Sequence, residues 1–174
     1  MKIKVKEFVE GLYTKEPFIN VKGDCIDLRA AEDYTFKAPQ AGVQYQKNNE
    51  KLRDVSFDCK MIKLGIAMEL PKGFSAIIKP RSSTTKKLKL VMATSGYIDN
   101  SYKGDNDEWC FYCYALDNTT IHKGDRICQF MIIPNQFASI LDKIKWLFTN
   151  KISFKWVKNL SNIDRGGHGS TGVK

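Results

Sequence analysis

Residues 59–79 read Cys59-Lys60-Met61-Ile62-Lys63-Leu64-Gly65-Ile66-Ala67-Met68-Glu69-Leu70-Pro71-Lys72-Gly73-Phe74-Ser75-Ala76-Ile77-Ile78-Lys79. Two runs rich in apolar residues flank the turn signal Pro71-Lys72-Gly73, a pattern typical of consecutive strands. Similar runs, rich in Ile, Val, Phe and Tyr, recur at residues 2–9, 109–116 and 126–133. This spacing of short strands predicts a mostly β sandwich or barrel.

Two segments interrupt the strand pattern. Residues 40–54 are polar, with Asn48-Asn49 at their centre, and are predicted to form a loop. Residues 136–148 place apolar side chains at helical spacing, which predicts one amphipathic helix. We expect this helix to pack on its own domain, with a partner-facing role as the alternative.

The length of 174 residues suits one domain with a real core. We expect a single β domain over residues 1–160, with insert-like segments at 40–54 and 136–160. Lysine carries most of the formal charge of +9 and is scattered along the chain. Because no dense basic block occurs, we expect neither nucleic acid nor a membrane as a partner.

The five cysteines follow no export signal, so we expect free thiols in a reducing cytoplasm. Cys110 and Cys113 have the spacing of half a zinc site, but no second Cys/His pair follows them. We therefore interpret the pair as packing within a strand.

The sequence near the C-terminus is Arg165-Gly166-Gly167-His168-Gly169-Ser170-Thr171-Gly172. Its glycines cannot build a core, but they allow backbone N–H groups to surround phosphate oxygens. We therefore expect residues 161–174 to form a flexible nucleotide-binding arm.

Four more polar clusters precede this arm, and their order is more informative than any one of them. They are Gly23-Asp24-Cys25-Ile26-Asp27-Leu28-Arg29-Ala30, Pro80-Arg81-Ser82-Ser83, Ser95-Gly96-Tyr97-Ile98-Asp99-Asn100-Ser101-Tyr102-Lys103-Gly104-Asp105 and Gly124-Asp125-Arg126-Ile127-Cys128-Gln129. The ordered set of five motifs resembles that of the trimeric deoxyuridine triphosphatases (dUTPases) of bacteria and their phages.

The resemblance implies a jelly-roll-like β fold assembled as a homotrimer, in which each active site draws motifs from three chains. It also implies magnesium-assisted hydrolysis of dUTP to dUMP and pyrophosphate. That reaction removes a miscoding nucleotide and supplies dUMP for thymidylate synthesis. In a bacterial cell or a phage-infected host, we expect the protein in the cytoplasm.

The chemistry of the third motif supports specific roles. Asp99 lies in an apolar-flanked turn, where a carboxylate can deprotonate a water that attacks the α-phosphorus. Tyr102 follows three residues later and can lie under a deoxyribose, leaving no room for a 2′-hydroxyl. The resemblance implies that backbone groups of Gly96, Tyr97 and Ile98 recognise uracil.

The phosphates need donors and positive charge, and magnesium needs oxygen ligands. We expect Asp27 to hold magnesium through water. The expected contacts to the nucleotide come from the second, fourth and fifth motifs: Arg81, Ser82, Ser83, Gln129, Arg165, His168, Gly169, Ser170 and Thr171.

Three departures from the family pattern concern the site. Asp24-Cys25 replaces Ala-Gly in the first motif, and Ser83 replaces the glycine of the second. His168 stands where the family usually has a phenylalanine that stacks on uracil. An imidazole can stack but has less apolar area and can be protonated.

Two alternatives remain at this stage. A dCTP deaminase of the same superfamily would use Glu108 beside the pyrimidine, but Thr84-Thr85-Lys86-Lys87 lacks the second arginine expected after Arg-Ser-Ser. A dUTPase scaffold that binds a regulatory protein is the second alternative, suggested by the apolar segment 137–157.

Overall fold

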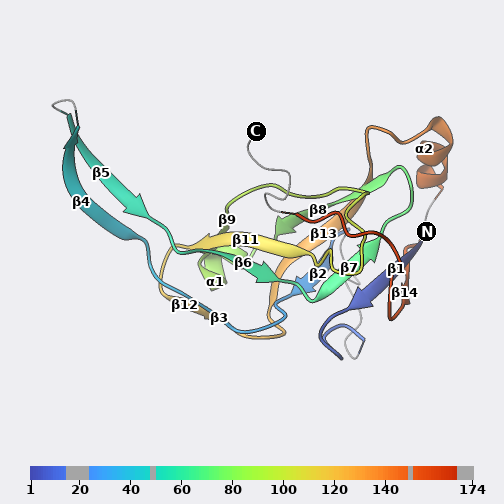
Figure 1. The fold of residues 1–174 in the computed structure, drawn as a ribbon, viewed down its shortest axis with the longest axis horizontal. Coiled ribbons are helices and arrows are strands. Elements are labelled where there is room, and N and C mark those ends of the chain that lie inside the picture. The colour runs from blue at the N-terminus through green and yellow to red at the C-terminus, as the bar shows by residue number, and fades with distance from the viewer. Residues whose placement is uncertain (15–23, 48–49, 149–150, 168–174) are drawn as a thin grey trace.

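The computed structural model describes residues 1–14, 24–47, 50–148 and 151–167, with backbone alone for residues 43–47 and 50–53. The described chain is mostly β, as predicted, with two short helices (Figure 1). The elements in chain order are β1 (Lys2–Glu7), β2 (Ile26–Arg29), β3 (Tyr34–Phe36), β4 (Gln40–Lys47), β5 (Glu50–Ser56), β6 (Cys59–Lys63), β7 (Ile66–Glu69), β8 (Phe74–Pro80), α1 (Thr84–Leu88), β9 (Leu90–Met92), β10 (Gly96–Ile98), β11 (Cys110–Ala115), β12 (Thr119–Ile121), β13 (Arg126–Pro134), α2 (Ile140–Leu147) and β14 (Ser153–Trp156).

Three sheets surround the core, with strand orders β10-β8-β13-β2, β14-β1-β7 and β6-β11-β9. Alternation along β11 shows how the sequence fills this core. Phe111, Cys113 and Ala115 are fully buried, while the residues between them are partly exposed. Cys110 and Cys113 both lie on β11, and Cys113 packs in the core. Among the described residues there is no group of three or more His, Cys, Asp or Glu side chains that could hold a metal.

The turn between β7 and β8 forms where the sequence predicted it. Gly73 has a φ of 82°, a left-handed conformation that favours glycine. The connection allows β8 to enter the four-stranded sheet, where it lies between β10 and β13. This sheet carries four of the sequence motifs at its strand ends.

The prediction of a loop over residues 40–54 was wrong. β4 and β5 form an antiparallel hairpin, with Gln40 opposite Ser56 and Lys47 opposite Glu50. In Figure 1 this hairpin projects from one end of the molecule. The two strands of a hairpin satisfy each other's backbone hydrogen bonds, so polar residues can form it without packing on a core. The prediction failed because such strands lack the alternation of apolar and polar residues that marks a half-buried sheet.

The amphipathic helix predicted within residues 136–148 is α2. Ser139 caps it, and the Asp142 carboxylate accepts hydrogen bonds from the Ser139 N–H and hydroxyl, which completes a capping box. The helix was expected to pack on its own domain, and Trp146 does pack against the core, but none of the residues of α2 is buried. Trp146 contacts Phe74 with ring centroids 5.5 Å apart. Most apolar side chains around the helix are exposed: Phe137, Ile140, Leu141, Ile144, Leu147 and Phe148.

The chain returns from α2 into β14, which pairs in parallel with β1, Lys2 opposite Ser153 and Val5 opposite Trp156. The first and last strands thus lie side by side, and residues 157–167 continue toward the third-motif loop. Across the described residues, neither helix has the length and apolar composition needed to cross a membrane.

Candidate active site

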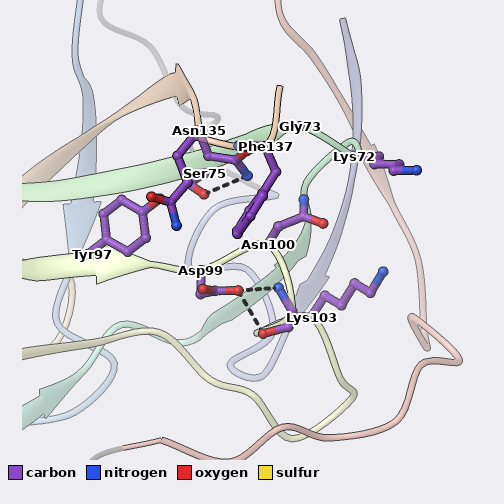
Figure 2. A pocket seen from close by; sticks show the side chains of 11 residues that line it. Lys72, Gly73, Ser75, Tyr97, Asp99, Asn100, Lys103, Asn135 and Phe137 are labelled. Carbon is purple, nitrogen blue, oxygen red and sulfur yellow. Dashed lines mark hydrogen bonds between the residues drawn. The ribbon is translucent and has the colours of Figure 1, made fainter. Parts of the chain in front are cut away.

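Asp99 follows β10 and lines a pocket of about 700 Å³. Ile98 is buried in the core, so alternation along the strand places Tyr97 and Asp99 toward the pocket. Figure 2 shows both side chains around the hollow, with Phe137 across from them. The other lining residues are Lys72, Gly73, Ser75, Asn100, Ser101, Lys103, Asn135 and Gln136.

The Asp99 carboxylate accepts hydrogen bonds from the Ser101 backbone N–H at 2.8 Å and from the Ser101 hydroxyl at 2.7 Å. These bonds, with a smaller contribution from the Arg165 charge, hold the pKa of Asp99 below its usual range. The carboxylate is therefore ionised at neutral pH. It can accept a hydrogen bond from a water molecule and receive its proton.

Asn100 holds the Asp99 turn in place, a role that the sequence analysis missed. Its side-chain amide donates to the carbonyls of Leu70, Pro71 and Phe74 at 2.8 to 3.1 Å. The amide thus ties the third motif to the β7–β8 turn. An asparagine directly after the candidate base was the only signal in the sequence.

Gly96 begins β10 at a point of close contact. A β-carbon there would lie 2.7 Å from the Ile78 β-carbon and 2.9 Å from the Ile78 carbonyl oxygen. Only glycine therefore allows β10 to pair with β8 at this register. The backbone of Gly96, Tyr97 and Ile98, predicted to recognise uracil, is fixed in this way.

Tyr102 is half-buried, and its hydroxyl donates to the Glu108 carbonyl at 2.8 Å. Burial raises the pKa of this phenol. Its ring edge faces Gly167, where a β-carbon would lie 3.2 Å from the Tyr102 ring. The beginning of the C-terminal arm thus contacts the residue predicted to select deoxyribose.

Asp27 and two arginines form a second polar cluster at the opposite end of the sheet. Arg81 Nε donates to Asp27 Oδ1 at 2.9 Å, and Arg126 Nη1 donates to Asp27 Oδ2 at 3.3 Å. Arg81 also donates to the Arg126 carbonyl at 3.1 Å. The carboxylate fixes both guanidinium groups, which are suited to phosphate oxygens. Its contact with Arg126 was not predicted.

The Arg81 loop is fastened by the buried side chain of Thr84. Its hydroxyl accepts from the Arg81 N–H at 2.9 Å and donates to the Ile127 carbonyl at 2.8 Å. Ser83 occupies the N-cap position of α1 without a side-chain cap bond, and Ser82 precedes it. Both serines of the motif therefore lie in the short loop between Arg81 and α1.

Gln129 lies on β13 opposite Asp27, and its side-chain amide donates to the Pro80 carbonyl at 3.2 Å. It thus belongs to the same cluster as Arg81. Glu108, by contrast, directs its carboxylate to the Gly65 N–H at 2.9 Å and does not line the Asp99 pocket.

The two clusters lie at opposite ends of β8. Asp99 lines the pocket with Ser75, near the beginning of β8, and Arg81 follows its end. Six residue steps of extended chain separate Ser75 from Arg81, or about 20 Å. One chain therefore does not place the predicted base beside the predicted phosphate ligands of the second motif.

Arg165 is exposed and lies near enough to Asp99 for its charge to lower the pKa of that carboxyl. The other predicted arm contacts, His168, Gly169, Ser170 and Thr171, lie outside the described residues.

The β fold places an ionised aspartate in a pocket and a separate arginine cluster at its other end, the kinds of group that hydrolysis of a phosphoanhydride needs, and comparison with known proteins gives the family. A dUTPase family model matches residues 45–172. The chain is 43% identical, over the full length of both chains, to the SPbeta prophage-derived deoxyuridine 5'-triphosphate nucleotidohydrolase YosS of Bacillus subtilis. The chain belongs to the dUTPase family.

Other relatives agree. The deoxyuridine 5'-triphosphate nucleotidohydrolase of Escherichia phage T5 is 31% identical over 116 residues, 66% of this chain and 69% of that protein. The fold is similar to that of the dUTPase from phage phi11 of S. aureus, with a TM-score of 0.58, 18% identity, and 79% and 94% of the two chains covered. It is also similar to that of Staphylococcus bacteriophage 80alpha dUTPase, solved with dUPNHPP, with a TM-score of 0.55, 18% identity and 98% of each chain covered.

Proposed function

We propose that this protein hydrolyses dUTP to dUMP and pyrophosphate. The observation that carries the proposal is the position of Asp99 in the wall of a pocket, beside the backbone of β10. Hydrogen bonds from Ser101 keep the Asp99 carboxylate ionised there. Family membership and the names of the relatives, which are deoxyuridine 5'-triphosphate nucleotidohydrolases, support dUTP as the substrate.

In the proposed reaction, Asp99 orients a water molecule and takes its proton as the water oxygen attacks the α-phosphorus. The bond from that phosphorus to the bridging oxygen then breaks, and pyrophosphate leaves. Arg81, Gln129 and Arg165 bind phosphate oxygens and stabilise the charge on the leaving group. Tyr102 supports the deoxyribose, and His168 covers the base.

Magnesium is the proposed cofactor, and the phi11 relative is described as coordinating a structural Mg(II) ion. The described residues contain no acidic cluster for a protein-only cage. Because both Asp27 oxygens already contact arginines, Asp27 fits magnesium only through water. A bound magnesium ion would neutralise charge on the triphosphate.

We further propose a homotrimer with shared active sites. Six residue steps of extended chain, about 20 Å, separate Ser75 in the Asp99 pocket from Arg81, and this distance supports the proposal. A neighbouring chain can bring its Arg81 cluster to the Asp99 pocket, which a single chain cannot do. A cytoplasmic location fits the free thiols of Cys59, Cys110, Cys113 and Cys128.

The first test is product analysis with purified protein, magnesium, and dUTP or dCTP. We expect dUMP and pyrophosphate from dUTP, no change in dCTP, and loss of turnover when EDTA removes magnesium. The Asp99→Asn variant should keep nucleotide binding but lose most turnover, because the amide preserves shape and removes basicity. A near-normal kcat in this variant would exclude Asp99 as the base.

The same reactions decide between the alternatives. Ammonia released from dCTP would identify a deaminase. The structure gives that alternative no support, because Glu108, the residue a deaminase would use, accepts a hydrogen bond from the Gly65 N–H instead of lining the pocket. If neither nucleotide is consumed, a regulatory binding role becomes the better proposal. Phage dUTPases, including that of Staphylococcus bacteriophage 80alpha, are described as controlling transfer of virulence genes, and the exposed apolar side chains of α2 would be the surface to examine.

A further inference from the structure

The apolar side of α2 is exposed and turned away from the domain. Trp146, which packs against Phe74, lies on the opposite side of the helix. Six large side chains at helical spacing form the exposed side, which we call the α2 stripe. They are between 44% and 82% exposed: Phe137, Ile140, Leu141, Ile144, Leu147 and Phe148.

The stripe is unusual for the surface of a single chain. An amphipathic surface helix normally turns its apolar side toward its own core. At roughly 150–200 Å² for each large side chain, the exposed part of the stripe amounts to roughly 600–800 Å². An exposed apolar patch of this size marks an interaction site, and it approaches the area of about 800 Å² that one partner contributes to a typical interface.

A second exposed apolar surface lies on the sheet β6-β11-β9. Phe57 and Leu116 are 45% and 48% exposed, and the ring centroids of Phe57 and Tyr114 lie 4.7 Å apart. Tyr114 on β11 pairs with Cys59 on β6, and continuing this register places Phe57 opposite Leu116. The three side chains Phe57, Tyr114 and Leu116 therefore share the outer face of the sheet, and we call them the sheet patch.

Each surface adjoins one half of the proposed active site. Phe137, in the α2 stripe, lines the Asp99 pocket (Figure 2). The Arg81 loop leads through α1 into β9, an edge strand of the sheet that carries the patch. The Lys89 carbonyl, between α1 and β9, accepts a hydrogen bond from the Leu116 N–H at 2.8 Å. The stripe therefore lies beside the predicted base, and the patch lies beside the phosphate-binding loop.

The two surfaces lie toward opposite ends of one chain. In Figure 1 α2 lies at one end, and the β4–β5 hairpin, whose second strand ends just before Phe57, projects from the other. The α2 stripe therefore cannot cover the patch of its own chain, but it can cover the patch of a second copy. Because the two contacting surfaces differ, the contact is head-to-tail, and contacts of this kind can close into rings.

We propose that the α2 stripe binds the sheet patch of a second copy of this chain. The inference rests on the proposed function, because it names the surface that holds the proposed trimer together. A stripe beside Asp99 that covers a patch beside Arg81 brings together two half-sites that belong to different chains. Burial of the stripe supplies the hydrophobic stabilisation for this contact.

The first test is the association of full-length variants, measured by analytical ultracentrifugation over a range of protein concentrations. Leu147→Glu in the stripe and Leu116→Glu in the patch each place a carboxylate at the proposed contact. Both side chains are exposed in the single chain, so the fold should persist, which circular dichroism checks. Each substitution should raise the concentration at which the trimer dissociates at least about tenfold, because an unpaired charge is costly to bury.

Phe8→Glu is the matched control for this test. Phe8 is also an exposed apolar side chain, but it follows β1 and belongs to neither surface. The same change in charge should therefore leave the dissociation of the trimer unchanged.

The second test identifies the contacting surfaces by cross-linking. Cys59→Ser first removes the exposed native thiol. In this background two differently tagged chains, one with Leu147→Cys and one with Leu116→Cys, are produced together and treated with a short bis-maleimide. We expect a covalent dimer that contains one chain of each kind. Neither variant alone should give this dimer, because a stripe meets a patch and not a second stripe.

The results separate this inference from the proposed reaction, because neither test needs turnover. The expected dissociation and cross-link in a protein that does not hydrolyse dUTP would support the contact and refute the reaction. An active trimer that both glutamate variants leave intact refutes the contact alone. A dimer cross-linked between two Leu147→Cys chains also overturns it, since the stripes would then pair with each other. A native protein that is monomeric refutes both the contact and the trimer.

Discussion

Thr84 offers the most quantitative test of how the fold fixes the Arg81 cluster. Its buried hydroxyl joins the Arg81 N–H to the Ile127 carbonyl. Thr84→Val keeps the shape of the side chain and removes both bonds. Leaving the buried Ile127 carbonyl without a donor should cost about 1–3 kcal/mol, and losing the bond to the partly buried Arg81 amide about 1 kcal/mol. We therefore expect a loss of about 2–4 kcal/mol in the free energy of unfolding.

Thr84→Ser is the matched control, because it retains the hydroxyl and removes one methyl group, worth about 1 kcal/mol. Urea unfolding at one fixed protein concentration gives both values, with unchanged slopes required for the comparison. The valine variant should also show a higher KM for dUTP, because the Arg81 loop is released. If the valine variant is as stable as the serine variant, the hydroxyl does not fasten the loop and the reasoning fails.

Two further predictions concern pH. Ser101→Ala removes a hydrogen bond that lowers the pKa of Asp99, so the pKa rises. A base works only when deprotonated, so the acid limb of the pH profile of kcat should move to higher pH. At about pH 8 kcat should change little. An acid limb that does not move would contradict the role of Ser101. If His168 stacks on uracil, protonation should weaken the contact, and KM for dUTP should rise from about pH 8 to 5.5. His168→Phe should remove this dependence, and a variant with unaltered kinetics at every pH would exclude the stacking.

Residues with strong local patterns were predictable. The apolar and aromatic run at residues 109–116 predicted the strand β11, and the residues around Asp99 predicted the turn found there. Both features depend on residues close in sequence, so the periodicity of apolar side chains and the presence of turn-forming residues are enough to predict them. The second motif was predictable in the same way, because Arg81 follows a strand that ends at Pro80.

Features that depend on distant contacts were not predictable. Asp107 reads as one more acid in a polar loop, and only the approach of Arg165 and Gly166 buries it. The β4–β5 hairpin lacks the apolar alternation that marks a strand against a core. For α2, helical spacing identified an apolar face but not that most of this face is exposed, because periodicity contains no information about what a face packs against.

The parallel pairing of β1 with β14 has a consequence for how the protein is made. β1 leaves the ribosome before every other described strand, but the partner of Lys2 is Ser153, 151 residues later in the chain. At about 5–20 residues per second, synthesis takes about 8–30 s to reach that partner. Until then one edge of β1, a strand with two fully buried side chains, has no neighbour. β7 pairs with the opposite edge of β1 and cannot protect this one. Such long-range pairing slows folding, so the nascent chain should depend on chaperones to protect that edge.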